Sequence, residues 1–269
     1  MTKSLSPTDT YLLPEELWPD ISHLVTEDEA PLDNLPSEKQ QRLLTEPLYS
    51  SWSGPSNAQG FLVAANVGLF ATNHQPPVLP DVFLSLDVQV AENWWEKRHR
   101  SYFFWEFGKP PDVVIEIVSN KEGNETGRKL QDYARMRVTY YAIFDPSQQL
   151  QGSVLQVYKF QDGKYAATTP QWLPQVELGL CLWSGVYEGK QDVWLRWCDR
   201  DCNVIPTGAE RAEQERLRAE QERGAKEAAL QQAEQERQSK EVAQQRAEQL
   251  AAQLRALGID PDEFGQQNR

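Results

Sequence analysis

The chain has 269 residues and a formal net charge of −13, with 39% hydrophobic and 25% charged residues. No stretch approaches the roughly 20 consecutive apolar residues that span a bilayer, so we expect no membrane partner. The first residues lack the apolar core of a secretory signal, and three cysteines are too few for a disulfide framework. We therefore expect a cytoplasmic protein with reduced thiols.

The composition changes abruptly near residue 207. Residues 1–206 contain all nine tryptophans and carry 17 Lys and Arg against 27 Asp and Glu, or 17 − 27 = −10. Residues 207–257 lack aromatic residues and proline, and their charge is 9 − 10 = −1. We predict an irregular acidic N-terminal arm (1–36), a globular domain (37–206), a helical tail (207–257) and a disordered C-terminus (258–269).

The start of the domain is predicted to contain one helix and two strands. Ser37 precedes EKQQRLLTEPLY as a candidate N-cap of a helix whose leucines face inward. The short apolar run at 61–72 is rich in residues that favour strands and predicts a buried strand. The alternation in VFLSLDVQV predicts a second strand from about Asp81 to Val90.

The segment 94–108 combines aromatic residues at both ends with a basic centre, WWEKRHRSYFFWEFG. Basic and aromatic residues together suit nucleic-acid contact, through phosphate neutralisation and base stacking. The alternative is a β-hairpin or loop whose rings fill the core. We favour this alternative because aromatic side chains are more often buried than exposed.

The segment PPDVVIEIVSN (110–120) predicts a central strand that is apolar on both faces. Glu116 lies in the middle of it. An isolated carboxylate there would be costly, so Glu116 must be protonated, paired with Arg or Lys, or bound to a cation. The strand alone does not decide between these states.

A second carboxylate must be close if Glu116 binds a metal ion. Asp112 lies on the same face of the strand but about 13 Å away, at roughly 3.3 Å per residue. Asp81 begins the preceding strand, and neighbouring strands are separated by only about 4.8 Å. If the two strands are neighbours, Asp81 and Glu116 can share one ion.

The next segments predict a strand–helix–strand crossover. A Gly-rich turn leads into RKLQDYARMRV, whose inner face contains Leu130 and Tyr133. The strand at 139–146 then lies parallel to the strand at 110–120. Lys129, in the first helical turn, could reach the strand ends. Two hairpins are predicted further on, one around Asp162-Gly163 and one at 192–207.

The tail repeats with a period of seven residues from Ala212. Its Ala, Glu, Gln and Arg are strong helix formers. The position three residues after each leading residue is Glu in three of six heptads and Ala in two, so the seam of a coiled coil is poor. The tail is either a single solvated helix or a weak coiled coil that closes near Leu250, Leu254 and Leu257. Either the tail or the domain could support a homo-oligomer.

From about residue 60 onward, the chain resembles the Uma-two family of restriction-endonuclease-like proteins. The resemblance is carried by an ordered set of segments: LPDVFLSL, PPDVVIEIVS, GRKLQDYARMRVTYYAIFDP and the AEQER tail. The resemblance implies a PD-(D/E)XK nuclease fold, an α/β core in which helices flank a mixed central sheet. It implies a metal-dependent endodeoxyribonuclease whose partner is DNA. It also implies a divalent ion, Mg²⁺ or Mn²⁺, held by Asp81 and Glu116, with the Ile117 carbonyl as a further ligand.

The family's lysine normally stands two residues after the glutamate, where this chain has Val118. Lys129 matches a lysine displaced to the following helix and is the third catalytic candidate, with Lys121 as a weaker one. Val118 and the acidic charge favour a second hypothesis, an inactive nuclease-fold protein that binds DNA or acts as a scaffold through its tail. DNA and RNA both remain open as substrates. A basic patch would have to come from few residues: Lys97, Arg98, Arg100, Arg128 and Lys129.

Overall fold

The computed structural model describes residues 34–72, 76–95, 99–119, 124–168 and 172–258. The chain divides into two compact units, Met1–Gly208 and Ala209–Arg269. The predicted N-terminal arm lies outside the described residues up to residue 33, and so does the predicted disordered end beyond Gly258. In the described parts, no helix is both long and apolar enough to cross a bilayer.

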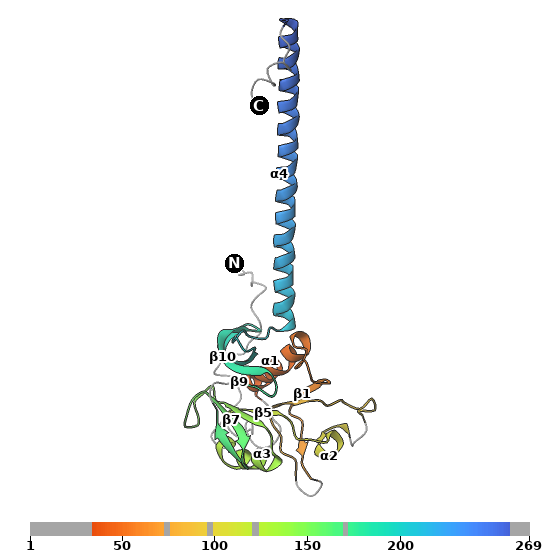
Figure 1. Ribbon diagram of the computed structural model, residues 1–269. Helices are drawn as coiled ribbons and strands as arrows, with labels where there is room; N and C mark the ends of the chain where they lie inside the picture. The colour runs from red at the N-terminus through yellow and green to blue at the C-terminus, as the bar shows by residue number, and fades with distance from the viewer. Residues whose placement is uncertain (1–33, 73–75, 96–98, 120–123, 169–171, 259–269) are drawn as a thin grey trace, which may run out of the picture. The chain divides into compact units, whose positions relative to one another are not determined.

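The first unit is built on a six-stranded mixed sheet (Figure 1). Its only parallel neighbours within the described strands are β5 and β6, and the other pairs are antiparallel. This confirms the predicted α/β class with a mixed central sheet. In spatial order the strands are β1 (Phe61–Ala65), β3 (Val82–Leu86), β5 (Val113–Ile117), β6 (Tyr140–Phe144), β7 (Leu155–Gln161) and β8 (Lys164–Ala167).

The predicted crossover joins β5 to β6. It contains a π-helical turn, Glu125–Lys129, which continues directly into the helix α3, Leu130–Met136. Parallel strands need such a connection because the chain must return to the same end of the sheet. The crossover therefore carries Lys129 and Tyr133 onto the face of the sheet that α3 covers.

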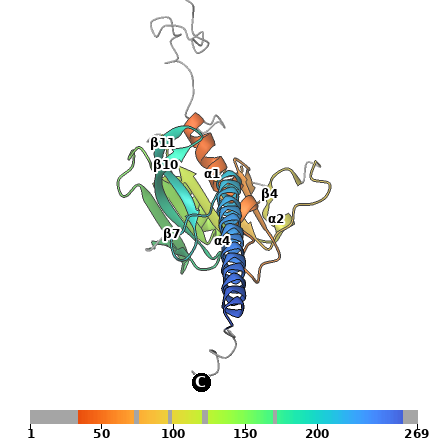
Figure 2. The ribbon, with the colours of Figure 1, turned by 90° about the horizontal axis from the view of Figure 1, so that it is seen from above.

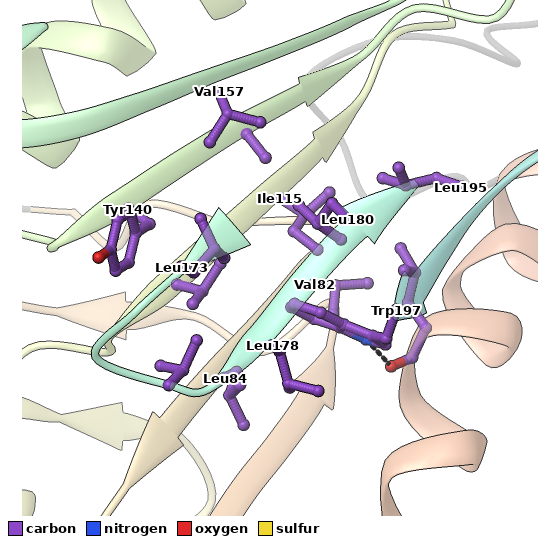
Figure 3. Close-up of a cluster of buried hydrophobic side chains, with 14 of the residues drawn as sticks. Val82, Leu84, Ile115, Tyr140, Val157, Leu173, Leu178, Leu180, Leu195 and Trp197 are labelled. Carbon is purple, nitrogen blue, oxygen red and sulfur yellow. Dashed lines mark hydrogen bonds between the residues drawn. The ribbon is translucent and has the colours of Figure 1, made fainter. Parts of the chain in front are cut away.

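One face of the sheet packs against α1 (Leu35–Ser51) and a second, three-stranded sheet (Figures 1 and 2). Figure 3 shows the core between them, where Trp197 donates a hydrogen bond from Nε1 to the Leu44 carbonyl at 2.7 Å. This bond satisfies the indole N–H inside an otherwise apolar layer. The strands of the second sheet are β9 (Trp172–Leu173), β10 (Leu178–Tyr187) and β11 (Lys190–Cys198).

The opposite face packs against α3 and a small layer made by β2 (Leu69–Phe70), β4 (Tyr102–Phe103) and the one-turn helix α2 (Phe104–Phe107). β2 and β4 pair in parallel. The prediction of a hairpin or loop at 94–108 is therefore wrong for its second half, which is a strand followed by a helical turn.

Several predicted boundaries differ from the structure for local reasons. Asn34, not Ser37, caps α1, because its Oδ1 accepts the Ser37 N–H at 2.9 Å. The strand predicted at 61–72 is interrupted at Asn66, whose φ of 55° is incompatible with a strand. The hairpin predicted at 192–207 is mostly the return strand of a longer hairpin, in which β11 pairs with β10. The other predicted hairpin is present, with Asp162 and Gly163 at its turn between β7 and β8.

The second unit contains most of α4, Gly208–Ala256, and none of that helix's residues is buried. Pairs such as Arg216–Glu213 at 2.7 Å and Arg237–Glu234 at 2.8 Å line its surface. Each such pair contributes only about 0.2–0.5 kcal/mol to helix stability. Gly258, with a φ of 79°, follows the helix, in line with the expected glycine stop.

We predict that truncation after Gly208 leaves the melting temperature of the first unit nearly unchanged, because no residue of α4 is buried. The truncated chain keeps the bond from the Gly208 N–H to Glu46 Oε1. Thermal unfolding followed by circular dichroism tests this. A control that ends at Asn203 should melt lower, because it loses Ile205, which packs on the core and bonds Trp197. A large drop for the first truncation would show that the helix stabilises the domain.

Candidate active site

Glu116 lies near the C-terminal end of β5, a buried central strand of the sheet. Its neighbours in β5 are Val113, Val114, Ile115 and Ile117, and every residue of the strand is buried. β-branched residues favour this position because they pack well between two layers. The Glu116 side chain is only 1% exposed, so its carboxylate needs partners inside the protein.

Both Glu116 oxygens have such partners, and both partners come from the crossover. The Lys129 ammonium lies 2.9 Å from Oε2 and forms an ion pair with it. The Tyr133 hydroxyl donates to Oε1 at 2.5 Å. Lys129 and Tyr133 are four residues apart, about one helical turn, so their side chains leave the helix on the same face.

Burial raises the pKa of Glu116 to about 8, although the Lys129 charge and the Tyr133 hydrogen bond oppose the shift. The Asp81 charge adds to the shift. Burial alone would lower the pKa of Lys129, but the charge and hydrogen bond of Glu116 outweigh burial and raise it. A bound metal ion would favour the ionised form of Glu116, as the Lys129 ammonium does.

Asp81 lies next to this group because β3 runs antiparallel beside β5. Val82 pairs with Ile115, and one further step along the register places Asp81 opposite Glu116. The Asp81 Oδ2 atom accepts the Ile117 N–H at 2.6 Å. The sequence left open whether β3 and β5 are neighbours, and the structure brings Asp81, Glu116 and Ile117 together at one end of these two strands.

Two amides on the other side of Asp81 hold it in place. Gln41 Nε2 lies 3.3 Å from Asp81 Oδ1, and the Gln41 and Asn66 side chains exchange two hydrogen bonds, at 3.1 and 3.3 Å. Gln41 is only 4% exposed. Sequence analysis missed this support because Gln41 is one polar residue on an amphipathic helix and Asn66 interrupts a predicted strand.

The remaining candidates lie elsewhere. Asp112 is at the other end of β5, where its Oδ2 accepts the Leu86 N–H at 2.8 Å and pairs with Lys109 at 2.5 Å. Val118 is buried in the hydrophobic layer beneath α3. Among the lysines that the structure describes, Lys129 is the one bonded to Glu116. Arg128 is largely exposed and pairs with Asp132. Lys121, Lys97 and Arg98 lie outside the described residues.

Glu125 is a further buried carboxylate that sequence analysis missed. It begins the π-helical turn, is 4% exposed, and its Oε2 has no hydrogen-bond partner. The Tyr141 hydroxyl donates to its backbone carbonyl at 3.0 Å. Burial raises the pKa of Glu125, opposed by the Lys129 charge. A polar residue in a Gly-rich turn predicts exposure, so the sequence carried no signal for this burial.

The residues present suit a hard divalent cation. Asp81 and Glu116 offer carboxylate oxygens, which Mg²⁺ prefers in proteins. Within the described residues, no three His, Cys, Asp or Glu side chains are gathered as a ligand set. A two-carboxylate site would therefore be completed by backbone carbonyl, water or phosphate oxygens, which is how Mg²⁺ is commonly held.

The mixed sheet, the crossover helix and the Asp–Glu–Lys group define a restriction-endonuclease-like protein. The family model of Uma2, described as "Putative restriction endonuclease", matches residues 26–184. This is more than half of the chain, and the chain belongs to the Uma2 family. The match includes Asp81, Glu116 and Lys129 and ends before β11 and α4. No curated protein and no solved structure matches the chain.

We predict that Glu125→Gln becomes progressively more stable than the wild type as the pH rises from 4.5 to 8, in EDTA. The pKa of Glu125 is raised in the folded state, so the wild type loses stability as the pH rises from the unfolded pKa through the folded one. Glutamine does not titrate and avoids this loss. Urea unfolding at pH 5 and pH 8 measures the difference. An equal difference at both pH values would contradict a raised pKa of Glu125 in the folded state.

Proposed function

We propose that this protein is a Mg²⁺- or Mn²⁺-dependent endonuclease that hydrolyses DNA phosphodiester bonds in the cytoplasm. The observation that carries the proposal is the buried Glu116 carboxylate, which is bound to the Lys129 ammonium and stands beside Asp81 across two neighbouring strands. Strongly shifted pKa values in one cluster of charges are typical of catalytic sites. The family's description points to the same class of reaction.

The ion would be held by Asp81, Glu116 and the Ile117 carbonyl. When bound, it would polarise the scissile phosphate and lower the pKa of a coordinated water. The amides of Gln41 and Ile117 fix the Asp81 carboxylate through hydrogen bonds. Tyr133 fixes the Glu116 carboxylate in the same way. These bonds orient both carboxylates before any ligand arrives, which lowers the cost of assembling the site.

Lys129 has two roles in this proposal. Its ammonium provides the countercharge that allows Glu116 to ionise inside the protein. Its side chain keeps 29% of its surface exposed, so it can also meet a phosphate at the site. There it would orient the attacking water or neutralise the charge that develops on the phosphate.

We predict that Glu116→Gln and Asp81→Asn abolish nicking of supercoiled plasmid in Mg²⁺ or Mn²⁺ while the fold is kept. Both changes preserve side-chain size and remove the charge that binds a cation. Gel analysis of the plasmid and isothermal titration with Mn²⁺ test activity and metal binding separately. Asp112→Asn is the matched control, since it removes a carboxylate at the far end of the same strand and should retain both. Full activity of Glu116→Gln would refute the assignment.

We predict that Lys129→Met lowers the cleavage rate by roughly a hundredfold, the order seen when one charge-stabilising group is lost. Below pH 7 its stability should change by under about 1 kcal/mol, because Glu116 can remain protonated. The stability cost should grow as the pH rises through 8, where the wild-type Glu116 ionises beside Lys129. Chemical unfolding at pH 6 and pH 9 measures this. Wild-type cleavage rates in the variant would exclude Lys129 from the site.

A second candidate function is a nuclease-fold protein without activity that binds DNA or serves as a scaffold. Three observations favour it: Val118 at the usual lysine position, the engagement of both Glu116 oxygens, and the absence of buried residues in α4. Such a helix can join two copies through Leu250, Leu254 and Leu257, or bind another partner. A wild-type protein that binds DNA but cleaves none in Mg²⁺ or Mn²⁺ would support this candidate over the first.

A further inference from the structure

Three tryptophans near the α2 turn are unusually exposed. Trp94, Trp95 and Trp105 have exposed fractions of 56%, 74% and 52%. They are the only exposed tryptophans among the described residues. Large aromatic side chains left in water forgo substantial burial energy, and grouped exposure of this kind is typical of a binding surface. We call Trp94, Trp95, Arg100, Phe103 and Trp105 the aromatic arm.

The rings of the arm form two contiguous groups. Trp94 and Trp95 lie with ring centroids 5.5 Å apart. Phe103 lies 4.9 Å from Trp105 on one side and 4.8 Å from Phe70 of β2 on the other. The arm therefore offers flat ring surfaces at two places, and neither group belongs to the two main hydrophobic cores.

Tyr102 anchors the arm to the domain. Its ring is 1% exposed, stacks on Phe107 at 4.4 Å and meets Phe83 of β3 edge-on at 5.1 Å. Its hydroxyl lies 2.8 Å from the Ser85 hydroxyl. The Phe103 and Trp105 rings thus project from a fixed base, so little conformational entropy is lost when they bind a ligand.

The same anchor places the arm on the face of the sheet that carries the candidate active site. Tyr102 belongs to the hydrophobic layer that also contains Tyr133, the residue that bonds Glu116. A strand bound at Glu116 and Lys129 would therefore lie over the layer to which the arm is attached.

The charge in this part of the chain suits a polyanion. Arg100 is exposed, and its Nε donates to the Trp95 carbonyl at 2.7 Å, which holds the guanidinium next to the Trp95 backbone. In the sequence, residues 97–100 are the only run of basic residues longer than two, in a chain of net charge −13. Aromatic rings beside arginine are the usual means of binding single-stranded nucleic acid, where rings stack on bases.

We propose that the aromatic arm stacks on unpaired bases and directs the site toward DNA with a single-stranded segment. Bases in an intact duplex are already stacked on their neighbours, so exposed tryptophans gain little from them. An unpaired base presents a free ring face to Trp95 or Trp105. The inference rests on the proposed function for its ligand class, but binding by the arm does not require cleavage.

Fluorescence anisotropy in EDTA tests the arm without catalysis. The probes are a labelled 20-nucleotide pyrimidine strand and the same strand in a blunt duplex. We expect the wild type to bind the single strand at least tenfold more tightly than the duplex. Trp95→Ala and Trp105→Ala should each weaken single-strand binding by roughly tenfold, the order expected when one stacking ring is removed.

Two controls separate stacking from damage to the fold. Trp95→Phe and Trp105→Phe keep a ring and should retain most of the affinity. Leu182→Ala changes an exposed apolar residue on β10 and should leave binding unchanged. Circular dichroism confirms that the variants are folded.

The outcomes also separate this inference from the proposed nuclease function. Single-strand binding that depends on the tryptophans supports the arm even if no metal gives cleavage. Equal affinity for strand and duplex, or affinity unaffected by the alanine changes, overturns the arm even if plasmid is cleaved. Absence of nucleic-acid binding would overturn it too.

Discussion

The structure of the domain depends on a carboxylate buried in its central strand. A strand with β3 on one side and β6 on the other, covered on both faces, has no water with which to solvate Glu116. The protein must therefore bring a hydrogen-bond donor and a positive charge to it. The crossover does both, because one helical turn presents Lys129 and Tyr133 together. Such a pair is weak support for stability, since its desolvation offsets most of the attraction. The presence of this pair is better explained by the reaction proposed for the site than by stability.

The order of strands follows from the same requirement. β6 must be parallel to β5 so that the connecting helix lies over the sheet and the turn before it reaches the end of β5. β3 must be antiparallel to β5 so that its first residues meet the last residues of β5. Asp81 and Glu116 are then opposed, although 35 positions separate them in the chain. The second sheet and α1 cover the other face.

Much of this arrangement could be predicted from the sequence, because the strongest signals are local. The run VVIEI can only be a buried strand, and the length of the following segment predicts a parallel crossover with Lys129 in its first turn. Contacts between distant polar residues could not be predicted in this way. The Gln41–Asn66 pair joins a helix to a strand break, and Glu125 is buried at the start of a π-helical turn. Nor did the exposed run LWSGVY reveal the long hairpin of β10 and β11.

The acidic charge of the chain bears directly on how it could meet a polyanion. At physiological ionic strength, exposed charges are screened beyond about 8 Å, so the net charge of −13 acts weakly at a distance. The acidic composition also means that few phosphates can be neutralised by lysine and arginine. Binding that depends on counterion release would therefore be modest. Affinity must then come from short-range contacts, of which ring stacking is the least sensitive to salt. A domain that exposes three of its eight described tryptophans, with Arg100 bonded to one of them, has the composition that such a balance requires. The charge and the aromatic arm are therefore consistent with each other, and an acidic nuclease of this kind would depend less on salt than a basic one.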